Sequence, residues 1–370
     1  MAVLNDLQSM VMDQAQSWVQ DRMPVAAFRA LRNADVGGFD PDQWSEIGDL
    51  GWCGVALPEE DGGSGLGYLN LGLILESLGR NVGATPLAAT AVAADVLAAA
   101  GSPALKSGWL ARLAAGEAIG ALAIDEGAAH APDAIAATAV PTEAGWRLNG
   151  VKRFVAEGMA ANLFIVAAQT EGGTALFAVD ANTPGLSRAP RRLTDCRDHA
   201  AVTLSDVVLE TDARLSGPTG DAALLEDLLD RARALAAAEL LGLSGGAFDT
   251  TLEYLKTRVQ FGQTIGAFQA LQHRAAKLYT RIELTRSAVE AALSAIDQQS
   301  PDRPLLVSIA KATAGETANL TTREMIQLHG GIGMTDDHDA GFYIKRSRVL
   351  ESTWGSAAWH RDRFGRLIGI

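Results

Sequence analysis

The chain has 370 residues, of which 48% are hydrophobic and 20% are charged, and its formal net charge is −13. This composition is typical of a globular protein with two or three domains or layers, and the acidic balance argues against nucleic acid or an anionic membrane as a partner. The two distant cysteines, Cys53 and Cys196, lack metal-ligand spacing and predict a reduced, cytoplasmic protein without a metal.

Residues 1–118 are predicted to form a helical domain. Apolar residues in the segment 69–80, LNLGLILESLGR, recur at steps of three and four, which is the spacing of an amphipathic helix. The Ala-rich run at 85–101, TPLAATAVAADVLAAAG, is interrupted by Asp95. It therefore indicates a buried helix and not a membrane span.

Residues 119–217 are predicted to form a β domain. Short β-rich runs, such as LFIVAAQ at 163–169 and TALFAVD at 174–180, are separated by Gly, Asn, Asp and Pro turns. Residues 218–370 return to long helical patterns, which usually pack as a bundle. The predicted fold class is α+β, mostly α, with an N-terminal helical domain, a middle antiparallel β domain and a C-terminal helical bundle.

Two glycine-containing strings in the last part of the chain carry candidate ligand-binding residues. The string RVQFGQTIGAFQALQ at 258–272 offers an arginine, a glycine turn and glutamines that would suit a pyrophosphate and an adenine. The string QLHGGIGMTDDHDAGFYIKR at 327–346 places three glycines after a helix, where an exposed backbone would suit a phosphate or a ribose. Taken singly, each string is explained better by a helix corner or a helix C-cap.

Together with the order of the blocks, these strings resemble the acyl-CoA dehydrogenase family. In that family R-x-x-F-G-x-x-I-x-x-x-Q closes on the flavin adenine dinucleotide (FAD) of a neighbouring subunit, and Q-x-x-G-G is its companion. The segments GWCGVALPEEDGGSGLG, LNGVKRFVAEGMAANLFIVAA and LSDVVL also resemble family segments, so the match covers nearly the whole chain. The resemblance implies FAD as the cofactor, with the following binding residues: Arg258, Gln260, Phe261, Gly262, Gln269, Gln327, Gly330, Gly331, Phe154, Ala156 and Ser356.

The resemblance also implies a C-terminal four-helix bundle, dimers or tetramers, and a reaction. An acyl-CoA thioester would lose an α-proton to a base and a β-hydride to the flavin, which yields a 2-enoyl-CoA and reduced flavin. An electron-transfer flavoprotein or a similar acceptor would then reoxidise the flavin.

The sequence departs from the family at three places. In the commonest family pattern a catalytic glutamate precedes Gly-Thr or Gly-Ser, but here the frame reads Trp354-Gly355-Ser356, and indole is not a base. Where the family has the acyl-binding loop T-E-P-x-A-G-S-D, residues 123–134 read AIDEGAAHAPDA and lack the Gly-Ser-Asp. On the flavin-facing strand, Ala156 replaces a hydroxyl-bearing residue, whereas Phe154 can still pack on the ring.

Glu239 is the candidate base that the chain itself offers. Some family members carry the base near an arginine equivalent to Arg233, which is expected to bind substrate, but the equivalent of that base is Ala232. Glu239 lies in the apolar stretch ARALAAAELLG, where burial would raise the pKa of its carboxylate toward that of a general base. An equally weighted alternative is that Glu239 bonds a neighbouring helix or a backbone group, or faces water. Asp230 is a weaker candidate, in a turn expected to be polar and exposed.

The C-terminal segment also resembles a bacterial heteromeric branch of the family that acts on bulky CoA thioesters, such as steroid side chains or dicarboxylic acids. In that branch two similar subunits pair, and one of them has lost the base. The chain is therefore expected to be a dehydrogenase, as a homo-oligomer or with a paralogous partner that completes the site. The alternatives are a non-catalytic subunit that stabilises an active paralogue, and a flavin oxidase or monooxygenase on the same scaffold.

Overall fold

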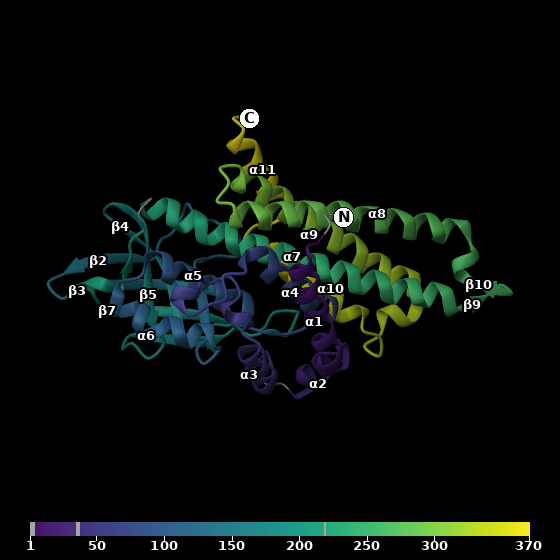
Figure 1. The fold of residues 1–370 in the computed structure, drawn as a ribbon, viewed down its shortest axis with the longest axis horizontal. Coiled ribbons are helices and arrows are strands. Elements are labelled where there is room, and N and C mark those ends of the chain that lie inside the picture. The colour runs from purple at the N-terminus through teal and green to yellow at the C-terminus, as the bar shows by residue number, and fades with distance from the viewer. Residues whose placement is uncertain (1–3, 35–37, 218–219) are drawn as a thin grey trace. The chain divides into compact units, whose positions relative to one another are not determined.

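The computed structural model (Figure 1) describes residues 4–34, 38–217 and 220–370. The chain divides into two compact units, each assembled from separate stretches. The bundle unit comprises Met1–Arg29, Tyr68–Gly83 and Arg233–Ile370, and the sheet unit comprises Ala30–Gly67 and Ala84–Ala232. The start of the predicted C-terminal domain, Pro218, lies outside the described residues.

The bundle unit is built from long helices. Its α9 packs against α8, α10 and α11. The helices that lie wholly or mainly in this unit are α1 (Asp6–Arg22), α4 (Gly67–Arg80), α7 (Asp221–Thr257), α8 (Gln269–Asp297), α9 (Arg303–His329), α10 (Ala340–Ser352) and α11 (Ala357–Leu367).

Helices α4 and α7 approach so closely that their backbones touch, because glycines line the contact. A Cβ added to Gly242 of α7 would lie 2.0 Å from the carbonyl oxygen of Glu76, and one added to Gly246 would lie 2.0 Å from that of Arg80. The contact continues from the other side, where a Cβ on Gly79 would lie 2.3 Å from the carbonyl oxygen of Glu239. Only residues without a side chain permit this spacing, so we call this contact the glycine seam.

The sheet unit combines helices with one mostly antiparallel sheet. The helices that lie wholly in the described part of this unit are α3 (Pro41–Asp49), α5 (Leu87–Ala100) and α6 (Pro103–Ala114). The sheet has the strand order β6-β7-β3-β2-β4-β5-β8, and β1 pairs in parallel with β4. The strands are β1 (Gly120–Ala123), β2 (Thr138–Thr142), β3 (Gly145–Ala156), β4 (Leu163–Thr170), β5 (Gly173–Asp180), β6 (Leu186–Pro190), β7 (His199–Glu210) and β8 (Arg214–Leu215).

The predicted fold class is confirmed: helices come first, an antiparallel-rich sheet follows, and helices close the chain. The runs at 163–169 and 174–180 form the buried strands β4 and β5, which pair with each other in an antiparallel register. A feature that was not predicted is a two-stranded hairpin, β9 (Val259–Gln260) and β10 (Gln263–Thr264), inside the first glycine string. Within the described ranges, no helix has the length and apolar character that a membrane crossing requires.

Candidate functional site

The first glycine string forms the tip of a hairpin that projects from the end of α7. Phe261 occupies the turn at φ 54° with 88% of its surface exposed, and Gly262 follows at φ 79°. Arg258 and Gln260 are exposed beside them, and Gln269 begins α8 in an exposed position. Its exposure on a turn with positive φ makes Phe261 a candidate for contact with a ligand or a second chain.

A stack of three rings joins the second glycine string to the first. His329 ends α9, and its ring centroid lies 4.4 Å from that of Tyr254 on α7 and 4.3 Å from that of His338. The Tyr254 carbonyl accepts a 2.8 Å hydrogen bond from the Arg258 N–H, which opens the hairpin. The structure therefore brings together two strings that lie about seventy residues apart, with Gly330 at φ 66° directly after His329.

Burial lowers the pKa of both histidines in this stack. The His329 Nδ1–H donates a 2.7 Å hydrogen bond to the Met325 carbonyl, and the His338 Nδ1 accepts one of 3.1 Å from the Ala340 N–H. Desolvation is the main cause of the lowered pKa of each ring. Both shifts favour the neutral form of the rings. No group of three His, Cys, Asp or Glu side chains in the described ranges could hold a metal ion.

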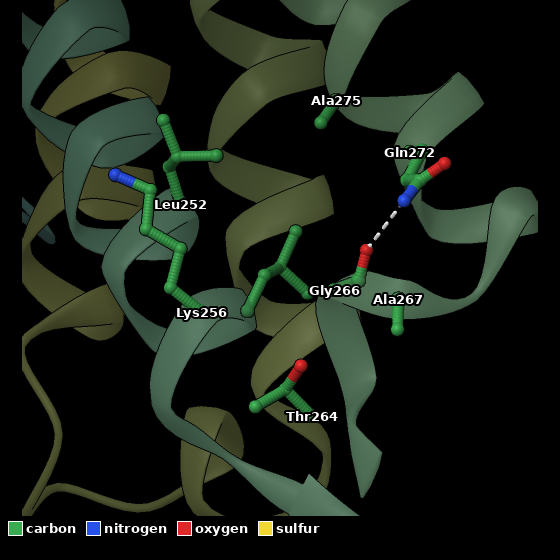
Figure 2. A pocket seen from close by; sticks show the side chains of 8 residues that line it. Leu252, Lys256, Thr264, Gly266, Ala267, Gln272 and Ala275 are labelled. Carbon is green, nitrogen blue, oxygen red and sulfur yellow. Dashed lines mark hydrogen bonds between the residues drawn. The ribbon is translucent and has the colours of Figure 1, made fainter.

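A cavity of about 330 Å³ lies between the end of α7, the segment 264–267 and the start of α8 (Figure 2). The Gln272 side-chain amide closes one wall by donating a 2.9 Å hydrogen bond to the Gly266 carbonyl. The volume is at the lower end for small-molecule pockets, and none of the predicted cofactor-binding residues lines it. The lining residues are Leu252, Leu255, Lys256, Thr264, Gly266, Ala267, Gln272 and Ala275.

The position expected for the family's base is a tight turn held by three buried side chains. Trp354 has φ 57° and Gly355 φ 105°. The Trp354 carbonyl accepts hydrogen bonds from the Arg233 Nε at 3.4 Å and from the His360 Nε2 at 3.1 Å. The Lys311 ammonium donates to the carbonyls of Gly355 and Glu351, each at 3.0 Å. We call the segment 353–356 the Trp354 turn.

Burial lowers the pKa of two of these donors, Lys311 and His360. The pKa of Lys311 is lowered to about 7, mainly by burial, while the nearby Glu351 opposes the shift and the Arg233 charge adds to it. Burial, followed by the charges of Lys311 and Arg233, also lowers the pKa of His360. Arg233 has no exposed surface, and its guanidinium lies 4.7 Å from the centre of the Trp359 ring. Its predicted contact with substrate stays a prediction.

Glu239 is hydrogen-bonded to Arg346, which was not predicted as its partner. The Arg346 Nε and Nη2 donate to the two Glu239 carboxylate oxygens at 2.8 and 2.9 Å, and the residues are 9% and 7% exposed. A bond to a neighbouring helix was the alternative role considered for Glu239, and the structure contains that bond. The expectation that Asp230 is exposed was wrong, because Asp230 is fully buried on α7.

The loop at 123–134 is held together by polar contacts inside the sheet unit. The Lys152 ammonium lies 2.6 Å from a Glu126 carboxylate oxygen. That carboxylate also accepts hydrogen bonds from the backbone N–H groups of residues 136 and 137. Burial lowers the pKa of Lys152, and the Glu126 partner opposes the shift. The Asp125 carboxylate lies 2.8 Å from the His130 Nδ1. The loop is therefore ordered although its Gly-Ser-Asp is missing.

The strand expected to face the flavin ends beside the same loop. Phe154 on β3 is 41% exposed and has φ 56°, and the Arg153 N–H donates to the Asp125 carbonyl at 2.7 Å. Ala156 pairs with His199 of β7. Lys152 was not predicted as a site residue.

Comparison with known proteins gives a consistent family match. The chain matches the models for the acyl-CoA dehydrogenase N-terminal domain at residues 5–117 and C-terminal domain at residues 221–369. Acyl-CoA dehydrogenase FadE27 of Mycobacterium tuberculosis is 31% identical over 338 residues, which cover 89% of this chain and 88% of the relative.

Two solved structures extend the match to the whole chain. A single-residue variant of the Tcur3481-Tcur3483 steroid ACAD has a TM-score of 0.90 and 34% identity, and the match covers 98% of each chain. The ChsE4-ChsE5 complex from Mycobacterium tuberculosis has a TM-score of 0.92 and 27% identity, with 99% of this chain and 98% of that chain covered.

Proposed function

Because the chain belongs to the acyl-CoA dehydrogenase family, we propose that it binds FAD and takes part in the α,β-desaturation of an acyl-CoA thioester. The observation that carries the proposal is the joining of the two glycine strings by the stack of Tyr254, His329 and His338. This stack presents both strings as one surface, which a ligand as long as a dinucleotide requires.

The residues on this surface fit FAD. A Cβ added to Gly262, Gly330 or Gly331 would meet nothing within 4 Å, so these backbones are open to close approach. The exposed Arg258 offers a fork of donors for a pyrophosphate, and Gln260 offers an amide for a base edge. Bound FAD would supply the hydride acceptor. The chain's own residues would hold and orient it.

The desaturation also needs a base for the α-proton, and we propose that a paralogous partner supplies it. Two observations support this: Trp354 stands in the frame of the usual base, and both Glu239 oxygens accept hydrogen bonds from Arg346. A base must be free to receive the proton that it removes. Glu239 as the base remains a competing prediction.

A bulky CoA thioester of the steroid type is the substrate class that we propose. The support is the 34% identity to a solved steroid acyl-CoA dehydrogenase over nearly the full length of both chains. The loop at 123–134, which lacks the Gly-Ser-Asp, is consistent with a different acyl group from that of family members that keep this motif.

Native mass spectrometry of the chain, co-expressed with a paralogous subunit, tests the proposal by counting flavins and subunits in each assembly. We expect a yellow assembly that contains both chains and FAD. A colourless protein that takes up no added FAD, alone or with the paralogue, would refute FAD binding. Flavin held only by the paralogue would favour a non-catalytic subunit, a role that Trp354 also fits.

A further inference from the structure

We propose that Glu239 and Arg346 act as a positioning pair that fixes α10 at one position along the axis of α7. The Trp354 turn, which follows α10, is fixed with it. The pair joins the middle of α7 to the middle of α10 through two parallel hydrogen bonds of 2.8 and 2.9 Å. Helix α10 ends at Ser352, two residues before Trp354, so its placement determines where the turn begins.

The two parallel hydrogen bonds fix the orientation of the two side chains as well as their distance. A guanidinium that donates through Nε and Nη2 to both oxygens of one carboxylate fixes distance and orientation together, which a single ammonium contact does not. Both side chains are also buried, with Glu239 7% and Arg346 9% exposed. Removing one partner would leave the other as a buried charge, which is strongly destabilising.

Two contacts at different positions along the axis of α7 fix α10 and the Trp354 turn relative to α7. Arg233, which bonds the Trp354 carbonyl, lies six residues before Glu239 on α7, or about 9 Å along the axis. Arg346 lies six residues before the end of α10, or about 9 Å along the axis, and Trp354 follows two residues later. The helices therefore run antiparallel, and turning α10 by one residue would rotate Arg346 by about 100° away from Glu239.

The Glu239 end of the pair is anchored by the glycine seam. The carbonyl oxygen of Glu239 faces Gly79 of α4 so closely that an added Cβ would lie at 2.3 Å. Helix α7 cannot shift locally without separating this backbone contact. Glu239 is therefore a fixed reference point against which α10 is placed.

The positioning role rests on the proposed function, because Ser356 is a predicted flavin contact at the end of the turn. The Ser356 hydroxyl also caps α11 by accepting the Trp359 N–H at 3.3 Å. A displaced α10 would move this serine, and the electronic environment of a bound flavin would report the movement.

The test measures the melting temperature and the visible circular dichroism of FAD in the assembly co-expressed with the paralogue. The variants are Glu239→Gln, Arg346→Gln, their double variant, and Arg346→Lys. Glu76→Gln is the matched control, because Glu76 pairs with Arg286 at 2.7 Å and is similarly buried in the bundle unit, but does not contact α10 in that pair.

We expect Glu239→Gln and Arg346→Gln each to lower the melting temperature by roughly 5–10 °C and to alter the flavin dichroism. The double variant should lose no more than the worse single one, because the two residues act as one unit. Arg346→Lys should fall between the wild type and Arg346→Gln. Glu76→Gln should lower the melting temperature and leave the flavin dichroism unchanged.

The proposal is overturned if Glu239→Gln leaves the melting temperature and the dichroism as in the wild type, the result expected of a residue that serves only as a base. It is also overturned if the two single effects add fully in the double variant, or if Glu76→Gln changes the dichroism equally. A wild-type assembly without flavin would instead refute the proposed function, while the melting temperatures would still report the coupling of the pair.

Discussion

Replacing Lys311 with methionine should change how the stability of the protein depends on pH. The lysine is 1% exposed, and its ammonium bonds two carbonyls of the segment that contains the Trp354 turn. Burial lowers its pKa from 10.5 to about 7. Methionine has a similar length and no titrating group, so the variant isolates the proton that Lys311 carries.

The direction of the effect follows from which state of the chain holds the proton. Well below pH 7, Lys311 is protonated in both the folded and the unfolded chain. Between about pH 7 and 10.5, Lys311 binds more protons in the unfolded chain than in the folded chain. The free energy of unfolding therefore rises with pH in this window, by up to about 1.4 kcal/mol per pH unit. Half-titration at pH 7 reduces the expected gain between pH 7 and pH 9 to about 2 kcal/mol.

Urea unfolding of the wild type and Lys311→Met at pH 7, 8 and 9 would measure this gain as a growing difference between the two proteins. Groups that titrate in both proteins, such as Cys53, whose pKa burial raises to about 12, cancel in the difference. Lys256→Met serves as a control, because Lys256 is exposed and should leave the pH dependence unchanged. Parallel curves for the wild type and Lys311→Met would refute the reasoning.

Gly242→Ala should lower the free energy of unfolding by about 2–3 kcal/mol in urea titrations, because its methyl group would lie 2.0 Å from the Glu76 carbonyl oxygen; Gly108→Ala, which meets nothing within 4 Å, is the control and should not destabilise. Phe261→Ala should change stability by less than about 0.5 kcal/mol, since Phe261 is 88% exposed, yet reduce the FAD content of the purified assembly; full flavin content would contradict its role. Burial, followed by nearby positive charges, lowers the pKa of His360, so stability should fall as the pH drops below the ordinary value of 6.5. His360→Gln should flatten that decline in a pH series of unfolding midpoints, and an unchanged slope would count against it.

The parts of the fold that could be predicted from sequence are those with a local signal. The apolar run of β4 and the turn residues around it predicted a buried strand, and the long helical patterns after residue 220 predicted helices. The hairpin of β9 and β10 escaped notice because two-residue strands are too short to show alternation. The burial of Asp230 was missed because a polar segment of a helix can be buried by elements distant in sequence.

The candidate site divides in the same way. The glycine strings were visible because their composition is unusual, but their contact depends on Tyr254 and His329, which lie 75 residues apart (329 − 254). Glu239 could be recognised as a charge in an apolar stretch, whereas its partner Arg346 is 107 residues away. Lys311 gave the same kind of signal, as a single charge in the Ala-rich segment SIAKATAG, and could have been found by the same argument.

The glycine seam has a consequence for how the chain is made. Helix α4 belongs to the stretch that ends at Gly83, while most of α7 belongs to the stretch that starts at Arg233. The ribosome must therefore add 150 residues (233 − 83) before α4 can meet the backbone that it is shaped to touch, which takes about 8–30 s at typical rates of synthesis. During that interval the face of α4 that touches α7 has no native cover. The order of synthesis thus makes α4 a segment on which a chaperone is expected to act while the chain is still growing.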